Sequence, residues 1–194
     1  MAARSTVAIL LFDDVEVLDF AGPFQVFAAA DELHGGRLWR TATVAENAGT
    51  VRATGGLKIV PEFTLENCPP PHVLIIPGGG GTRALLQKTS MLEWIRWKAR
   101  TAECMFSVCT GALVLGRAGL LDQLTVTTHH LTLDLLREIA PSANVDASAR
   151  FHDQGKVLTA AGISAGLDAA LHLVGRLAGK GVAEATARYM EYTT

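Results

Sequence analysis

The chain has 194 residues, of which 49% are hydrophobic and 19% are charged, so intrinsic disorder is excluded. Its net charge of −2 excludes an extended basic surface for nucleic acid or for an anionic membrane. The first apolar run is too short for a signal peptide or a membrane span, so we expect a cytoplasmic protein. We expect one domain that spans residues 1–194 and has no linker or internal repeat.

Predicted strands and helices alternate along the chain. Apolar, β-branched runs that are bounded by turn residues predict strands at 6–12, 38–46, 72–76, 104–108 and 124–130. Helical spacing of apolar residues predicts helices at 22–33, 85–100, 110–121, 131–140, 164–179 and 182–192. Two further segments, 51–62 and 149–162, each place a glycine-containing turn between β-like runs and predict hairpins.

The alternation of strands and helices predicts an α/β fold, a three-layer sandwich with a mostly parallel central sheet. Ligands of such sheets bind at the carboxyl ends of the strands. The segments Asp13–Asp19 and Gly78–Gly81 and the residue Cys109 each follow a predicted strand, so we expect them to meet at that edge.

Cys109 stands where the predicted strand "CMFSV" turns into the predicted helix "TGALVLGRAGLL". Its neighbours at two residues' distance, Ser107 and Gly111, are small, as a tight nucleophile elbow requires. A thiol at a helix N-terminus is favoured in its ionised form, so we expect an outward-facing thiolate with a pKa lowered from about 8.5 to about 6. The alternative is a buried structural cysteine. Cys104 is expected in the core and Cys68 in a loop, and all three cysteines are expected to be free thiols.

The glycine run "IPGGGG" lacks the lysine and the spacing of a phosphate-binding loop, so we expect no nucleotide cofactor. Bare backbone amides beside a reacting centre can stabilise developing negative charge. Gly79 and Gly80, together with the amide of Thr110, are therefore candidates for an oxyanion site. The alternative is a flexible loop.

Asp19 is a single carboxylate within an otherwise apolar stretch, "VEVLDFAGPF". It could cap the helix predicted to begin at Pro23, but Gly22 is better placed as the N-cap residue. Asp19 follows the first strand and therefore lies at the same edge as Cys109. A carboxyl group that shares a proton with the thiol could act as general acid and then as general base.

His129 and His130 end the segment "TVTTHH". No other histidine or glutamate stands at a metal-ligand spacing from them, so we expect no metal site. Either histidine could serve as a base for Cys109, and the sequence leaves open which one faces the site.

The segments "VLDFAGPFQVF", "LIIPGGGG", "SVCTGALVLGRAGLL", "TVTTHH" and "GISAGLDAALHLV" together resemble the ThiJ/PfpI superfamily, whose fold is similar to that of class I glutamine amidotransferases and flavodoxin. Within it the sequence most resembles the isonitrile hydratases, which have an aspartate in the first motif and a Cys-Thr-Gly elbow. The peptidase branch has a histidine directly after its cysteine, where this chain has Thr110. The same module resembles the ligand domain of AraC-type transcription regulators.

The resemblance implies a homodimeric enzyme without a cofactor that hydrates a small molecule, an isonitrile, to an N-substituted formamide. Cys109 would attack the terminal carbon, and Asp19 would protonate that carbon and then activate water. The amides of Gly79 and Thr110 would orient the intermediate, and the Thr110 hydroxyl could hold the water.

The expected walls of the substrate pocket are Phe20, Ile163 and nearby apolar groups. Two alternatives remain open at this point: another small-molecule cysteine enzyme of the superfamily, such as a glyoxalase, and a non-enzymatic redox or ligand sensor whose thiol is oxidised.

Overall fold

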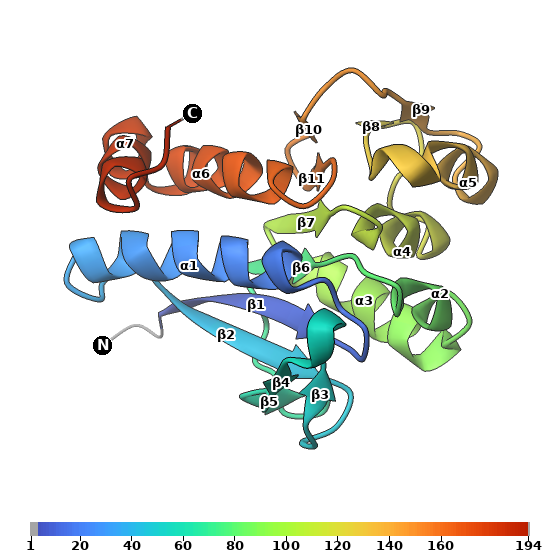
Figure 1. The fold of residues 1–194 in the computed structure, drawn as a ribbon, viewed down its shortest axis with the longest axis horizontal. Coiled ribbons are helices and arrows are strands. Elements are labelled where there is room, and N and C mark those ends of the chain that lie inside the picture. Colours follow the sequence, from blue (N-terminus) through green and yellow to red (C-terminus); the bar gives the residue numbers. More distant parts are fainter. Residues whose placement is uncertain (1–3, 194) are drawn as a thin grey trace.

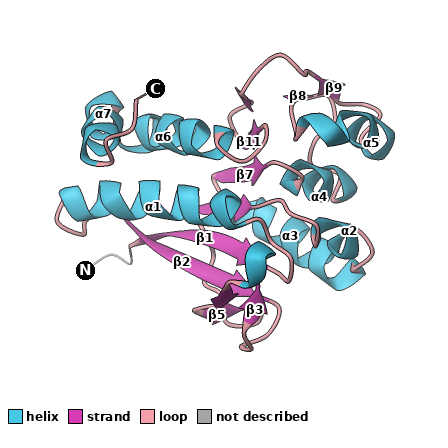
Figure 2. Cartoon of the chain, in the orientation of Figure 1, coloured by secondary structure: helices cyan, strands magenta, loops and turns pink. Residues whose placement is uncertain are grey.

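The computed structural model describes residues 4–193 and consists of a central sheet between two layers of helices (Figures 1 and 2). The strands are β1 (Ser5–Leu11), β2 (Trp39–Ala45), β3 (Val51–Arg52), β4 (Lys58–Ile59), β5 (Phe63–Thr64), β6 (Val73–Ile76), β7 (Cys104–Val108), β8 (Thr125–Val126), β9 (Asn144–Val145), β10 (Phe151–Asp153) and β11 (Val157–Ala160). The α-helices are α1 (Val17–Leu33), α2 (Thr82–Leu85), α3 (Thr89–Thr101), α4 (Gly111–Arg117), α5 (Leu133–Ile139), α6 (Ala165–Ala178) and α7 (Lys180–Tyr189), and short 3-10 turns are formed by Thr54–Gly56 and His130–Thr132.

The main sheet has seven strands in the order β10-β11-β7-β6-β1-β2-β5. All neighbouring pairs are parallel except the edge pair β10–β11, which is the predicted hairpin at 149–162. Strands β6, β7 and β11 are buried at every position, which explains why their sequences are continuous apolar runs. The predicted three-layer α/β fold with a mostly parallel sheet is confirmed.

The helices cover both faces of this sheet. Helices α1, α6 and α7 pack against one another on one face, while α4 contacts α2 and α5 on the other (Figure 1). The chain runs from β1 outward to β2 and then returns to β6 on the other side of β1, so the topological switch point lies between the carboxyl ends of β1 and β6.

Two helix predictions are wrong in their boundaries. Helix α1 begins at Val17, not at Pro23, because the Glu16 side chain caps it by accepting a hydrogen bond from the amide of Val17 (3.2 Å). Pro23 therefore lies inside the helix, where it leaves the carbonyl of Asp19 without its helical donor. The helix predicted at 85–100 is broken into α2 and α3 because Lys88 adopts an extended backbone conformation.

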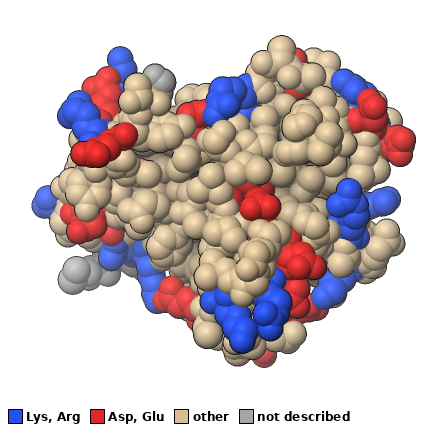
Figure 3. Space-filling model, viewed as in Figure 1, with Lys and Arg blue, Asp and Glu red and all other residues tan. Residues whose placement is uncertain are grey.

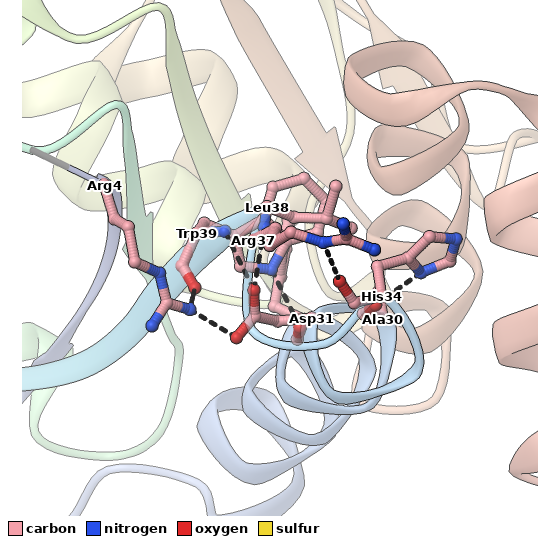
Figure 4. A network of polar contacts seen from close by, with 8 residues as sticks. Arg4, Ala30, Asp31, His34, Arg37, Leu38 and Trp39 are labelled. Carbon is pink, nitrogen blue, oxygen red and sulfur yellow. Dashed lines mark hydrogen bonds and ion pairs between the residues drawn. The ribbon is translucent and has the colours of Figure 1, made fainter. Parts of the chain in front are cut away.

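The turn between α1 and β2 is fixed by Asp31 (Figure 4). Its Oδ1 accepts hydrogen bonds from the amides of Leu38 (2.9 Å) and Trp39 (3.1 Å), and its Oδ2 pairs with Arg4. The indole of Trp39 donates to the carbonyl of Phe27 (2.8 Å) and packs edge-on against the Phe27 ring. These contacts hold the connection between α1 and β2 in place.

Basic and acidic side chains are interspersed around the face shown in Figure 3, without a field of one sign. Within residues 4–193 no helix is both long enough and apolar enough to cross a membrane.

Candidate active site

The predicted nucleophile elbow is present at Cys109, between β7 and α4. Cys109 has φ = 56°, a left-handed conformation that non-glycine residues seldom adopt. Its amide donates to the carbonyls of Ala160 (3.1 Å) and Ala161 (2.8 Å) at the end of β11, which holds the strained residue in place. A Cβ atom on Gly111 would lie 2.0 Å from the carbonyl oxygen of Ile76, so this turn can form only with glycine there.

Asp19 is fully buried in the first turn of α1. Its Oδ2 accepts a hydrogen bond from the amide of Gly78 (3.0 Å), whereas its Oδ1 has no hydrogen-bond partner among residues 4–193. Burial raises the pKa of Asp19 to about 7, against the smaller lowering effects of the Gly78 amide and the neighbouring Cys109 thiol, and the charge of Glu16 raises it further. Asp19 is therefore a carboxyl group that titrates near neutral pH.

The expected outward-facing thiolate is wrong. Cys109 is only 6% exposed, and burial together with the charge of Asp19 raises its pKa to about 12. The amides of Thr110 and Ile163 face the sulfur and lower the pKa, but two donors do not outweigh loss of water and a neighbouring carboxylate. The helix that follows has seven residues, which limits the help that its N-terminus can give.

Cys109 and Asp19 form one coupled acid–base pair. Near and above neutral pH the pair holds one proton, on the sulfur, beside a carboxylate that can accept it. The pair can therefore produce a thiolate at the moment of attack, without holding one at rest. The carboxyl group is then placed to pass the proton to an atom bonded to the sulfur.

The loop formed by residues 78–81, called the glycine loop below, packs so closely against Asp19 and the start of α4 that a side chain would not fit at Gly78. A Cβ atom on Gly78 would lie 2.6 Å from the amide nitrogen of Thr110 and 2.8 Å from Asp19 Oδ2. The amide of Gly79 donates to Thr110 Oγ1 (3.0 Å), so it does not face the sulfur and its predicted oxyanion role is not supported. Gly80 is exposed in the turn that follows.

The Thr110 hydroxyl is engaged in hydrogen bonds within the glycine loop. It accepts the Gly79 amide and lies within hydrogen-bond distance of the Gly79 carbonyl (3.3 Å) and of the Thr82 hydroxyl (3.2 Å). Its side chain therefore fixes the loop that carries Gly78. The amide of Thr110 is the part of this residue that faces the sulfur.

The sequence analysis missed one position that shapes the site, Thr128, and one role of an expected pocket residue, that of the Ile163 amide. The buried Thr128 donates its hydroxyl hydrogen to the carbonyl of Cys109 (2.8 Å) and so clamps the elbow from the far side. Ile163 supplies an amide to the sulfur and has φ = 44°, a genuine outlier for a β-branched residue. The motif "TVTTHH" contains Thr128, but the adjacent histidines gave the stronger chemical signal.

The two histidines differ in their surroundings. His129 is half-buried, and its ring packs so closely on Gly162 that a Cβ atom there would lie 2.5 Å from His129 Cδ2. Its Nδ1 accepts the amide of Leu131 (3.3 Å), and burial and His130 lower its pKa, so the neutral ring carries its proton on Nε2. His130 is exposed. His129 thus borders the Gly162–Ile163 turn of the site.

The predicted apolar walls differ in exposure. Phe20 is buried directly after Asp19, and Ile163 is 38% exposed. Within residues 4–193 no group of three or more histidine, cysteine or carboxylate side chains is placed to hold a metal ion.

Comparison with known proteins adds to this geometry. Isonitrile hydratase of Pseudomonas putida is 36% identical over 186 residues, which cover 96% of this chain and 78% of that protein. An HTH-type transcriptional regulator of Pseudomonas aeruginosa is 28% identical over 96% of this chain but only 50% of its own length, so this chain spans half of the regulator.

Solved structures have the same architecture. A ThiJ/PfpI family protein from Pseudomonas syringae matches with a TM-score of 0.88 and 31% identity, over 100% of this chain and 77% of that chain. DJ-1beta of Drosophila melanogaster has a TM-score of 0.83 at 17% identity, over 98% of this chain and 100% of that chain, which shows a shared fold. The DJ-1/PfpI family model matches residues 5–176. The chain therefore belongs to the DJ-1/PfpI family.

Proposed function

We propose that this protein hydrates isonitriles to N-substituted formamides, with Cys109 as nucleophile and Asp19 as acid and base. The observation that carries the proposal is the buried carboxyl group beside the thiol, with a pKa of about 7. The identity of 36% to isonitrile hydratase of Pseudomonas putida supports the choice of substrate class.

In the first half of the reaction, the ionised Asp19 takes the thiol proton as the sulfur of Cys109 attacks the terminal carbon of the isonitrile. Asp19 then delivers that proton to the same carbon. The S–H bond is broken, an S–C bond and a C–H bond are formed, and the product is a thioimidate on Cys109. A substrate carbon held near both groups benefits from proximity as well as from proton transfer.

In the second half, Asp19 accepts a proton from water as the water oxygen attacks the thioimidate carbon. The substrate nitrogen gains a proton, and the C–S bond then breaks to give the formamide and a sulfur that recovers its proton. The amides of Thr110 and Ile163 face the sulfur and stabilise the charge that develops on it in both halves. Asp19 Oδ1, which has no partner among the described residues, is the oxygen free to handle these protons.

The surroundings favour a small substrate without net charge. Phe20, which is buried next to Asp19, and the partly exposed Ile163 would supply apolar walls, and an isonitrile carries no net charge that would have to be desolvated. Selective oxidation of the thiol is disfavoured by its raised pKa, because the thiolate is the form that attacks peroxide.

The direct test is formamide formation from cyclohexyl isocyanide by the purified protein. We expect turnover that is abolished in Cys109→Ala and reduced about 10²–10⁴-fold in Asp19→Asn, since general acid–base catalysis supplies factors of this size. Because Asp19 must be ionised to accept the thiol proton, the wild-type rate should rise as the pH passes through about 7.

A matched control is Cys68→Ala, which removes a thiol that is held near Lys98 on α3 and lies outside the site. This variant should keep its activity. If wild-type protein turns over cyclohexyl isocyanide no faster than Cys109→Ala does, the hydratase proposal is wrong. Consumption of methylglyoxal by the wild-type protein would point instead to a glyoxalase.

A further inference from the structure

A cavity borders the glycine loop at Gly81, apart from Cys109 and Asp19. It has a volume of about 340 Å³, within the range of small-molecule sites. It opens at the carboxyl ends of β1 and β2, where Phe12 and Ala45 lie, and Gly81 of the glycine loop forms part of its wall. The cavity lies at the carboxyl edge of the sheet, where α/β sheets bind ligands. Neither Cys109 nor Asp19 lines it.

The inner walls of this cavity are apolar. They are formed by buried side chains from the ends of β1 and β2, from the first residue of β3 and from the two helices that follow the glycine loop: Leu11, Phe12, Ala45, Val51, Leu85 and Met91. These inner walls favour a ligand that carries an apolar body of a few carbon atoms.

The rim of the cavity carries charges of both signs. Lys88 pairs with Glu46 across the opening (2.6 Å), and both side chains are more than 40% exposed. On the Lys88 side, α3 begins without a side-chain cap, so its first amides add a positive end to the lysine. On the Glu46 side lies Asp13, a second carboxylate.

We propose that this cavity binds an apolar α-amino acid. The carboxylate would bind Lys88 and the start of α3, the ammonium would bind Glu46 and Asp13, and the side chain would enter the apolar cavity. A ligand with one charge would have to separate Lys88 from Glu46 and leave one of them without a partner. A zwitterion provides a partner for each.

The test is titration of the ¹⁵N-labelled protein with L-leucine, followed by NMR. We expect saturable shifts of the amides of Gly49 and Gly81, which line the cavity, and none at Ile163. Glycine, 4-methylpentanoate and 3-methylbutylamine each lack one feature of the proposed ligand and should bind at least about tenfold more weakly, in line with the loss of one charge-assisted contact or of the apolar body.

Variants at the rim separate this site from the catalytic one. Lys88→Met and Glu46→Gln should weaken leucine binding about tenfold or more, and Ala84→Phe should block the cavity from α2. Cys109→Ala should bind leucine as the wild type does, whether or not the protein is a hydratase. Asp134→Asn, which breaks the surface pair with Arg137 (2.7 Å), is the matched control and should also bind normally.

Two results would overturn the proposal of an amino acid site. One is the absence of saturable shifts at Gly49 and Gly81 in a folded protein. The other is binding of the single-charge analogues as tightly as leucine, because a zwitterion would then have no advantage.

Discussion

At the scale of single residues, burial of the Asp19 carboxylate lowers the free energy of unfolding at neutral pH. A carboxyl group with a pKa of about 7 in the folded chain and 3.8 in the unfolded chain binds its proton more tightly when folded. Its contribution to the free energy of unfolding is therefore fully present at about pH 4 and is lost as the pH rises through about 7. At neutral pH the folded protein is therefore less stable, but the ionised carboxylate of Asp19 is the form that can act as a base.

We predict that Asp19→Asn removes this pH dependence. The free energy of unfolding of the variant, relative to wild type, should increase by on the order of 4 kcal/mol between about pH 4 and pH 8, because asparagine does not titrate. Urea unfolding at a series of pH values measures it. Parallel curves for the two proteins would contradict the raised pKa.

The backbone of Cys109 gives a second prediction. Its φ of 56° is unfavourable by roughly 1–2 kcal/mol for a residue with a Cβ atom but not for glycine. Cys109→Gly should therefore be about 1 kcal/mol more stable to urea than Cys109→Ala. At Ser107, in the extended strand before the elbow, the order should reverse, with Gly less stable than Ala by roughly 0.5–1 kcal/mol. The same order at both positions would mean that the elbow is not strained.

The proximity of Cys109 and Asp19 could be predicted from the sequence, but their ionisation could not. Spacing after the strands was enough to bring Cys109 and Asp19 together. The pKa of each group depends on how much water reaches it, which is set by the packing of distant segments around the pair. Thr128 and the amide of Ile163 contact Cys109 from segments distant in the sequence, and no local sequence pattern predicts such contacts.

At the scale of elements, the site depends on backbone-to-backbone contact between the glycine loop, the loop before α1 and the start of α4. The amide of Glu16 donates to the carbonyl of Gly78 (2.9 Å), and Val15 forms a β-bridge with Gly79. Such contacts leave no room for side chains at Gly78, Gly81 and Gly111. The three loops therefore pack directly against one another through their backbones.

We predict that Gly111→Ala destabilises the protein by about 1–3 kcal/mol and also lowers activity, because the added methyl group meets the main-chain oxygen of Ile76. Gly181→Ala is the matched control. It lies in α7 with no atom within 4 Å of the added carbon, so it should stabilise the protein by about 0.5–1 kcal/mol. Thermal unfolding and the formamide assay measure both. If Gly111→Ala changed stability and activity as little as Gly181→Ala, the close approach of Gly111 to the Ile76 carbonyl would be contradicted.

The long apolar elements were predicted well because burial on both sides leaves a strong pattern, as in β1 and β7. The two-residue strands β5 and β9 were missed because two residues carry no periodicity. The start of α1 was missed because proline is so often the first residue of a helix. Here Glu16 caps the helix, so that α1 begins at Val17, six residues before Pro23.

At the scale of the whole molecule, we predict a homodimer, as the family resemblance implies. Leu18 and Ile163 lie in the segments that carry Asp19 and the amide facing Cys109, and each is 38% exposed, so a partner could shield apolar surface around the site. Light scattering at micromolar concentration should give twice the chain mass of 20.6 kDa. A mass of one chain would contradict the prediction.

The main sheet ends in very short strands on both sides, two residues in β5 and three in β10. Each border therefore presents only a few main-chain groups to which a foreign segment could add. Conversion of this protein to fibrils must then begin from chains that have already lost part of their native arrangement, and conditions that preserve the folded state should suppress fibril growth even in concentrated solutions.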